Sequence, residues 1–337
     1  MPLVILSTAA TVIASQAVIA GAFSVTQQAM QLGFAPRFAI RHTSASEIGQ
    51  IYIPGINWTL CVLVVICVLY FQSSSNLAAA YGIAVTLDMV ITATLFAIIL
   101  RRLWKWSRLA TGALIGGFLL VDLAYLSANL VKIEAGGWFP LVFGTIVFFL
   151  LATWLRGREA LQRAASDDAV PLTPFVQSLA ASKSVARVAG SAVFLTSNRD
   201  TVPNALLHNL KHNRVLHERN VLLSVYTLEQ PRVPDTLRVA VEPIVAGFWR
   251  VSVYYGFMES PDLPAALEWT SEQGLDLEQQ DTSFFLGRES IRPKAGMGLA
   301  AWRGRLFGAM YRNSGTAANF FKLPPNRVVE LGSQVVL

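Results

Sequence analysis

Five apolar stretches, each about as long as a membrane-spanning helix, dominate the first 155 residues of the chain. They run near residues 3–24, 55–71, 77–100, 109–130 and 138–155. About 20 apolar residues in a helix cross the hydrocarbon core of a bilayer, although the second stretch is short for a full span. This pattern predicts an α-helical polytopic membrane domain over residues 1–155. It excludes an ordinary water-soluble protein.

The rest of the chain has a different composition. Residues 1–155 hold only 11 charged side chains, whereas the whole chain holds 27 Lys and Arg and 21 Asp and Glu. A segment rich in Ala, Ser and Asp predicts a linker over 156–174. Strand-like and helix-like runs then alternate through residues 175–337, which predicts a cytosolic α/β domain. The strand-like runs are SAVFLTS, NVLLSVYTL and WRVSVYY, and the helix-like runs are PNALLHNLKHN and PDLPAALEWTSEQ.

A basic and apolar stretch near the end of the chain, between Arg303 and Arg312, predicts one further helix. Apolar residues on one side and basic residues on the other are typical of an amphipathic helix. We expect this helix to dock on its own domain rather than to lie on lipid.

Positive charges in the loops predict the orientation, because Lys and Arg concentrate on the cytoplasmic side of a membrane. They follow the first, third and fifth stretches, whereas the alternate loops contain few. The C-terminal domain is therefore expected to be cytoplasmic and Met1 to lie outside. A chain with this start and an odd number of spans is expected to be the C-terminal part of a longer protein. Basic residues in cytoplasmic loops explain the net charge of +6, so nucleic acid is not an expected partner.

Polar side chains within the spans are the candidates for an ion path, because they are costly in lipid. Thr11 and Ser15 belong to a stripe of small and polar residues in the first span, which fits close helix packing or a hydroxyl lining for an ion. Tyr81 and Asp88 share a helix face in the third span. Asp88, and likewise Asp122 in the fourth span, has two possible roles. The carboxyl group holds a cation or carries a proton, or it is protonated and hydrogen-bonded to a neighbouring helix.

A basic cluster in the second half is the other candidate site. It contains His208, Lys211, His212 and Arg214. The two histidines have a zinc-like spacing, but no Cys or intervening Glu accompanies them, so no metal is expected. Two interpretations of the cluster remain: a solvated basic stretch, and a patch that binds an anion such as a nucleotide. No phosphate-binding loop or nucleophile motif occurs in the sequence, so neither an enzyme nor a cofactor is predicted.

Several long strings then identify a family resemblance. ATVIASQAVIAGAFS, QLGFAPRFAIRHTSASEIGQIYIP and SSNLAAAYGIAVT resemble the Kup family of bacterial potassium transporters, and so do GGWFPL, HNLKHNRVLHERN, TSFFLGRES and PPNRVVELGSQV in the later part. The resemblance implies proton-coupled potassium uptake across the inner membrane. It implies twelve helices in a LeuT-like arrangement with two inverted five-helix repeats, of which the five spans resemble helices eight to twelve. Tyr81 is then the main expected contributor to the ion site.

The same resemblance implies the partners. These are the lipid bilayer, transported K⁺ and H⁺, and the missing N-terminal half of the transporter. A homodimer through the cytosolic domain is left open. An alternative function is a membrane-anchored regulatory or sensor module, which pairs with a separate N-terminal half and does not transport alone.

Overall fold

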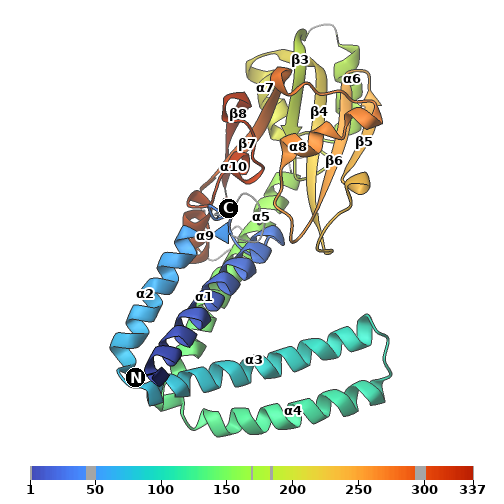
Figure 1. Cartoon of the computed structure of the whole chain (residues 1–337). Coiled ribbons are helices and arrows are strands. Elements are labelled where there is room, and N and C mark those ends of the chain that lie inside the picture. The colour runs from blue at the N-terminus through green and yellow to red at the C-terminus, as the bar shows by residue number, and fades with distance from the viewer. Residues whose placement is uncertain (1, 43–50, 168–169, 183–184, 293–300, 337) are drawn as a thin grey trace. The chain divides into compact units, whose positions relative to one another are not determined.

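A computed structural model describes residues 2–42, 51–167, 170–182, 185–292 and 301–336 (Figure 1). The chain forms two compact units. The first unit combines Met1–Gly55 with Ala152–Leu337, and the second unit is Ile56–Leu151. The boundary at residue 152 lies inside a continuous helix, so the units do not coincide with the division predicted from composition.

The five predicted spans are all present as long helices. They are α1 (Pro2–Gln31), α2 (Pro54–Phe71), α3 (Ser74–Arg102), α4 (Arg108–Leu130) and α5 (Trp138–Asp167). By length and hydropathy, each of these five helices in the described residues is long and apolar enough to cross a membrane. Ser73 and Ser107 cap α3 and α4, because their side chains accept hydrogen bonds from the first-turn N–H groups of Asn76 and Ala110.

Helices α3 and α4 form an antiparallel hairpin in the second unit (Figure 1). Four of the six side chains that α3 buries recur every seven residues, at Ala79, Thr86, Ala93 and Leu100. The first three of these are small residues, which let two helices approach closely in a membrane. Gly82 is also a point of close approach, because a Cβ there would lie 2.8 Å from Oδ1 of Asn129 on α4. We call this buried stripe the α3–α4 seam.

The turn that leads into α5 requires a glycine at one position. A π-helical turn, Ile133–Gly137, joins α4 to α5, and Gly136 within it has a φ of 143°. A Cβ on Gly136 would meet the ring of Phe71 and the carbonyl oxygen of Asn76. Trp138, at the start of α5, packs edge-on against Tyr70 with ring centroids 5.5 Å apart. A side chain of any size at residue 136 would therefore disturb this aromatic corner.

Helix α5 continues well beyond its predicted end. It runs for 30 residues to Asp167, so most of the segment expected as a linker is helical; residues 168 and 169 lie outside the described residues. Its sequence there, REALQRAA, is rich in strong helix formers, which outweigh the polar composition that suggested a linker. Helix α6 (Leu172–Ala181) begins before the predicted end of that segment at residue 174.

The amphipathic helix predicted near the end of the chain is present as α9 (Ala301–Arg312). Its Phe307 is 0% exposed and packs against Trp154 of α5 with ring centroids 5.5 Å apart. Gly157 of α5 makes room for this ring, because a Cβ at that position would collide with Phe307. Nε of Arg303 also donates to the Thr153 hydroxyl at 3.3 Å. The surface that receives α9 is therefore the C-terminal part of α5.

The α/β domain is built on a six-stranded sheet in the order β5-β6-β4-β3-β7-β8. All neighbours are parallel except β5 and β6. This confirms the predicted α/β class. Two of the predicted strands lie inside β4 and β6, and the third overlaps β3 but was predicted to end two residues later. The strands are β3 (Ala186–Leu195), β4 (Val215–Leu228), β5 (Val239–Val245), β6 (Phe248–Gly256), β7 (Thr282–Arg292) and β8 (Val328–Val336).

Both faces of the sheet are buried, as parallel sheets require. Ala192 and Phe194 of β3 face one core with helices α6 and α7 (Asn204–His212), whereas Val193 faces the other core with α8 (Leu263–Glu268). The period-2 alternation of strand side chains thus fills two layers. The remaining elements are short: β1 (Arg41–His42), β2 (Ile51–Tyr52), α10 (Ala317–Phe320) and the 3-10 turns Asp235–Leu237, Ser271–Gln273, Gln279–Asp281 and Pro325–Arg327.

Candidate functional site

The predicted polar candidates of α3 lie on a different face of the helix from the α3–α4 seam. Tyr81 is 71% exposed, and Asp88 is also exposed one face away from the seam. Ala84 and Thr92, at the same helical spacing, are exposed too. The structure therefore brings the predicted candidates of α3 together on one open stripe, which α4 does not cover.

Asp122 lies in a different environment. It is 6% exposed and sits seven residues from the buried Ile115 on the seam face of α4. Because α3 and α4 are antiparallel and Asn129 lies against Gly82, Asp122 comes level with the seam between Thr86 and Ala93. The two acidic candidates thus differ in burial. Asp122 is buried in the contact between the helices, whereas Asp88 is exposed on the open stripe.

The hydroxyl stripe of α1 is exposed. The Thr11 hydroxyl donates to the carbonyl oxygen of Ser7 at 2.7 Å, and the Ser7 hydroxyl donates to Val4 at 3.0 Å. These bonds stay within the helix and satisfy the hydroxyl donors without a partner helix. Ser15 lies one turn further along the same exposed stripe.

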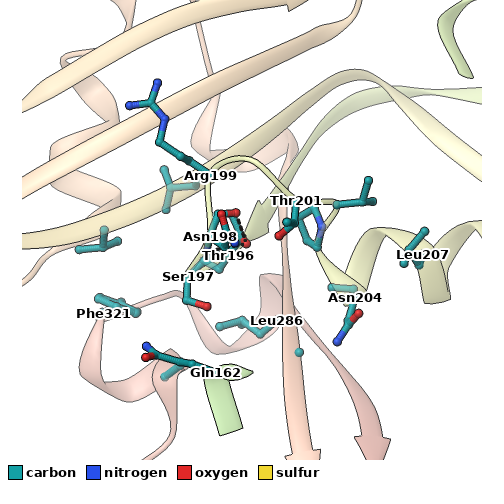
Figure 2. A pocket seen from close by; sticks show the side chains of 18 of the residues that line it. Gln162, Thr196, Ser197, Asn198, Arg199, Thr201, Asn204, Leu207, Leu286 and Phe321 are labelled. Atoms are coloured by element: carbon teal, nitrogen blue, oxygen red, sulfur yellow. Dashed lines mark hydrogen bonds between the residues drawn. The ribbon is translucent and has the colours of Figure 1, made fainter. Parts of the chain in front are cut away.

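A large cavity lies in the first unit, where the chain leaves the central strands of the sheet (Figure 2). Its volume is about 660 Å³. Strand β3 has β4 on one side and β7 on the other, and the chain passes from β3 through α7 to β4 before it returns to β7. The cavity therefore lies at the switch point of the strand order, where open α/β sheets bind their ligands.

The polar wall of the cavity is the loop between β3 and α7. The Thr196 hydroxyl and the backbone of Asn198 exchange hydrogen bonds of 2.9 and 3.2 Å, which fixes a tight turn directly after the strand. Figure 2 shows this turn on one side of the cavity and the apolar side chains of Leu286 and Phe321 on another. Helix α7 then begins at Asn204, which also lines the cavity. A polar loop and an apolar wall thus face the same space.

Every charged residue in the described part of the cavity lining is an arginine. Arg199 points away from the other labelled side chains in Figure 2 and bonds both carboxylate oxygens of Glu242 at 3.1 Å, and this carboxylate raises the pKa of Arg199. Arg37, in the segment after α1, and Arg158, on α5, have no carboxylate within 4 Å in the described part of the chain. The lining therefore carries two basic groups that no acid of the described residues neutralises.

Packing holds Arg37 in place. Its guanidinium lies over the rings of Phe320 and Phe321, 4.8 and 5.4 Å from their centroids, and its carbonyl oxygen accepts a hydrogen bond from the N–H of Gly315. Burial and then the nearby charge of Arg158 lower the pKa of Arg37. Two guanidinium groups that repel each other in a partly buried cavity favour the binding of an anion.

The predicted basic cluster lies at the other end of α7. The rings of His208 and His212 stack with centroids 5.9 Å apart, which agrees with their spacing on a helix. Lys211, His212 and Arg214 are exposed, and Lys211 and His212 lie in the last turn of α7, where positive charge interacts favourably with the helix dipole. None of the four residues of this cluster lines the cavity described above.

Sequence reasoning missed the cavity arginines. Arg37 and Arg158 carried a signal, since both are basic residues beside spans, but that signal indicated only orientation. The loop TSNRDTVP carried another, because a polar turn between a strand and a helix is the usual place for a ligand site in an α/β fold.

Fold and site together define an integral membrane protein in which five apolar helices precede an α/β domain. Comparison with known families agrees. The "K+ potassium transporter integral membrane domain" matches residues 1–159, and the "K+ potassium transporter C-terminal domain" matches residues 189–337. The chain belongs to the Kup family of potassium transporters.

Individual relatives support this assignment. "Probable potassium transport system protein Kup" of Aromatoleum aromaticum is 56% identical over 336 residues, which cover 100% of this chain and 52% of the relative. The protein of the same name from Azoarcus sp. is 55% identical over 336 residues, with the same two shares. "Kup 2" of Rhizorhabdus wittichii is 56% identical over 335 residues, or 99% of this chain and 52% of the relative. The chain spans about half the length of the curated relatives it matches, and their names are those of transporters rather than enzymes.

Proposed function

We propose that the chain is the C-terminal part of a potassium transporter of the inner membrane, working as a proton-coupled symporter with its α/β domain in the cytoplasm. The observation that carries the proposal is the open stripe of α3. Its Tyr81 and Asp88 are exposed, whereas the opposite face of the same helix is packed against α4. Polar side chains in a membrane are expected to face other helices or a water-filled path. An N-terminal half, as found in the longer relatives, would supply that cover.

The share of the relatives that the chain spans supports the same proposal. In transporters with inverted repeats, the ion site lies between the two repeats, near the middle of the membrane. A chain that supplies one repeat contributes one side of such a site. The transported ions are then K⁺ and H⁺, and the partners are the bilayer and the other half of the transporter.

A chimera tests this proposal. The chain is joined behind the N-terminal half of the Aromatoleum aromaticum relative and expressed in a bacterium that lacks its own potassium uptake. We expect the chimera to restore growth at low potassium and this chain alone to fail. Dissipating the proton gradient should stop uptake by the chimera. A chimera that reaches the membrane without transporting, while the intact relative transports, would contradict the proposal.

A second candidate function is a membrane-anchored regulatory module that pairs with a separate N-terminal half. The cavity of the α/β domain favours it, because the cavity has the size and position of a ligand site. Expressing the two halves as separate chains distinguishes the candidates. Uptake by the co-expressed halves supports a transporter in two pieces, whereas binding of the halves without uptake supports the regulatory module.

A further inference from the structure

The cavity at the switch point of the sheet has three properties that together specify a ligand. The first is its size. At about 660 Å³, it falls within the range of roughly 300 to 1,000 Å³ that small-molecule sites occupy. A single inorganic ion would leave most of this space empty, so the volume favours a ligand with an organic part.

The second property is its charge. Among the residues that the structure describes, no Asp or Glu lines the cavity, and Arg37 and Arg158 line it without an acidic partner. Arg158 donates one hydrogen bond to the carbonyl oxygen of Gly33 at 3.2 Å, and a guanidinium has five N–H donors. The remaining donors suit an oxyanion, and guanidinium groups match phosphate in particular, with two parallel hydrogen bonds each.

The third property is the arrangement of polar and apolar walls. Helix α7, which is nine residues long, opens on the cavity at Asn204 and Ala205, and Pro203 before it provides no side-chain cap. Backbone N–H groups at such an end interact favourably with an anion. Leu223, Leu286 and Phe321 provide an apolar wall for the rest of the molecule.

We propose that this cavity binds the phosphate group of a small molecule between Arg37 and Arg158, with the organic part against the apolar wall. The site goes beyond potassium transport and does not depend on it. Arg37 belongs to the segment after α1, Arg158 belongs to α5, and the other walls belong to the α/β domain. Binding therefore ties the ends of two membrane helices to that domain, and the occupancy of the site can control how firmly they are held together.

Thermal unfolding of the full chain in nanodiscs of phosphatidylcholine tests the proposal, because a ligand that binds the native state raises the Tm with concentration. The probes are AMP, inorganic phosphate and adenosine, which lacks the phosphate. We expect AMP to raise the Tm, phosphate to act at higher concentration and adenosine to have no effect. R37Q and R158Q should each weaken AMP binding by roughly tenfold or more. Arg156 is exposed on α5 and does not line the cavity, so R156Q is the matched control and should bind as the parent does.

A second arm identifies the source of the phosphate. Nanodiscs that contain phosphatidylglycerol offer an anionic lipid headgroup instead of a soluble ester. If this lipid raises the Tm of the parent and of R156Q but not of R37Q or R158Q, while AMP and phosphate do nothing, the phosphate comes from the membrane. Stabilisation by AMP or inorganic phosphate with the same dependence on the two arginines assigns it to a soluble molecule.

Two results would overturn the proposal. One is the absence of stabilisation by AMP, phosphate and phosphatidylglycerol alike, and the other is equal stabilisation of the parent, R37Q and R158Q. If a glutamine variant fails to give a monodisperse protein, R37K and R158K replace it. They keep the charge but lose the paired geometry, so we expect intermediate binding. Binding of the lysine variants at full parental affinity counts against the site.

Discussion

The guanidinium of Arg158 on α5 donates a hydrogen bond of 3.2 Å to the carbonyl oxygen of Gly33, 125 residues earlier in the chain. Gly33 has a φ of 79°, a left-handed conformation that costs other residues more than it costs glycine. A Cβ on Gly33 would also collide with Nη1 of Arg158. The glycine thus serves two purposes: it lets the chain turn after α1, and it leaves room for the arginine.

Gly33→Ala should therefore lower the stability of the chain and displace Arg158. The left-handed backbone alone costs about 1–2 kcal/mol for a residue with a Cβ. We expect a lower Tm and weaker phosphate binding in the same variant, measured by thermal unfolding with and without AMP. Gly21→Ala is the control, since nothing lies within 4 Å of a Cβ at that position in α1. A Gly33→Ala protein with parental Tm would show that this turn is not required.

The α3–α4 seam predicts a second effect. Gly82→Leu places a large side chain where the amide of Asn129 lies, so the two helices must separate or shift. Overpacking of this kind costs about 1–3 kcal/mol. Thermal unfolding in detergent should show a clear loss for Gly82→Leu, whereas Gly117→Leu on the open side of α4 should unfold like the parent. Equal Tm values for the two variants would contradict close packing at Gly82.

The separation of the two acidic candidates gives a third prediction, which uses the transport chimera. Asp88→Asn removes a carboxyl group from the open stripe, and Asp122→Asn changes a side chain buried in the seam. If the stripe faces the ion path, Asp88→Asn should reduce rubidium uptake several-fold or more, whereas Asp122→Asn should mainly lower the amount of folded protein. Uptake divided by the amount of protein in the membrane distinguishes the two effects. Normal uptake per molecule by Asp88→Asn would remove that residue from the path.

Local patterns were enough to predict the elements of this fold but not its cavity. Hydropathy located all five spans because each apolar stretch is a local signal, and periodicity located β3, β4 and β6 in the same way. The end of α5 was misplaced, because Ala, Leu and Arg sustain a helix through a segment whose polarity suggested a linker. The cavity depends on Arg37 and Arg158 lying close together, and no local pattern connects two residues so far apart in sequence.

The rings of His208 and His212 lie side by side because a helix brings residues four apart onto one face. Spacing could not show which end of α7 borders a cavity. That depends on the order of the strands, because the switch point places the cavity at the start of α7, while these histidines lie toward its end.

A partly buried ion pair in the α/β domain predicts how stability changes in acid. Glu259 accepts hydrogen bonds from Arg238 at 2.8 Å, from the N–H of Gly256 at 2.6 Å and from the N–H of Val233 at 3.1 Å. Burial raises the pKa of Glu259, but these bonds together outweigh it and lower the pKa below its ordinary value. The side chains of Arg238 and Glu259 are 13% and 16% exposed, so solvent screens the pair weakly.

Because the pKa of Glu259 is lower in the folded state than in the unfolded state, the carboxylate stabilises the fold above the unfolded pKa. That contribution is lost as the pH falls through the folded pKa. Glu259→Gln should therefore lower the Tm near pH 7, by the equivalent of about 1–3 kcal/mol, and flatten the decline of Tm in acid. Glu229→Gln removes an exposed carboxylate after β4 and is the matched control. Tm profiles against pH that remain parallel for the parent and Glu259→Gln would show that this carboxylate does not drive acid unfolding.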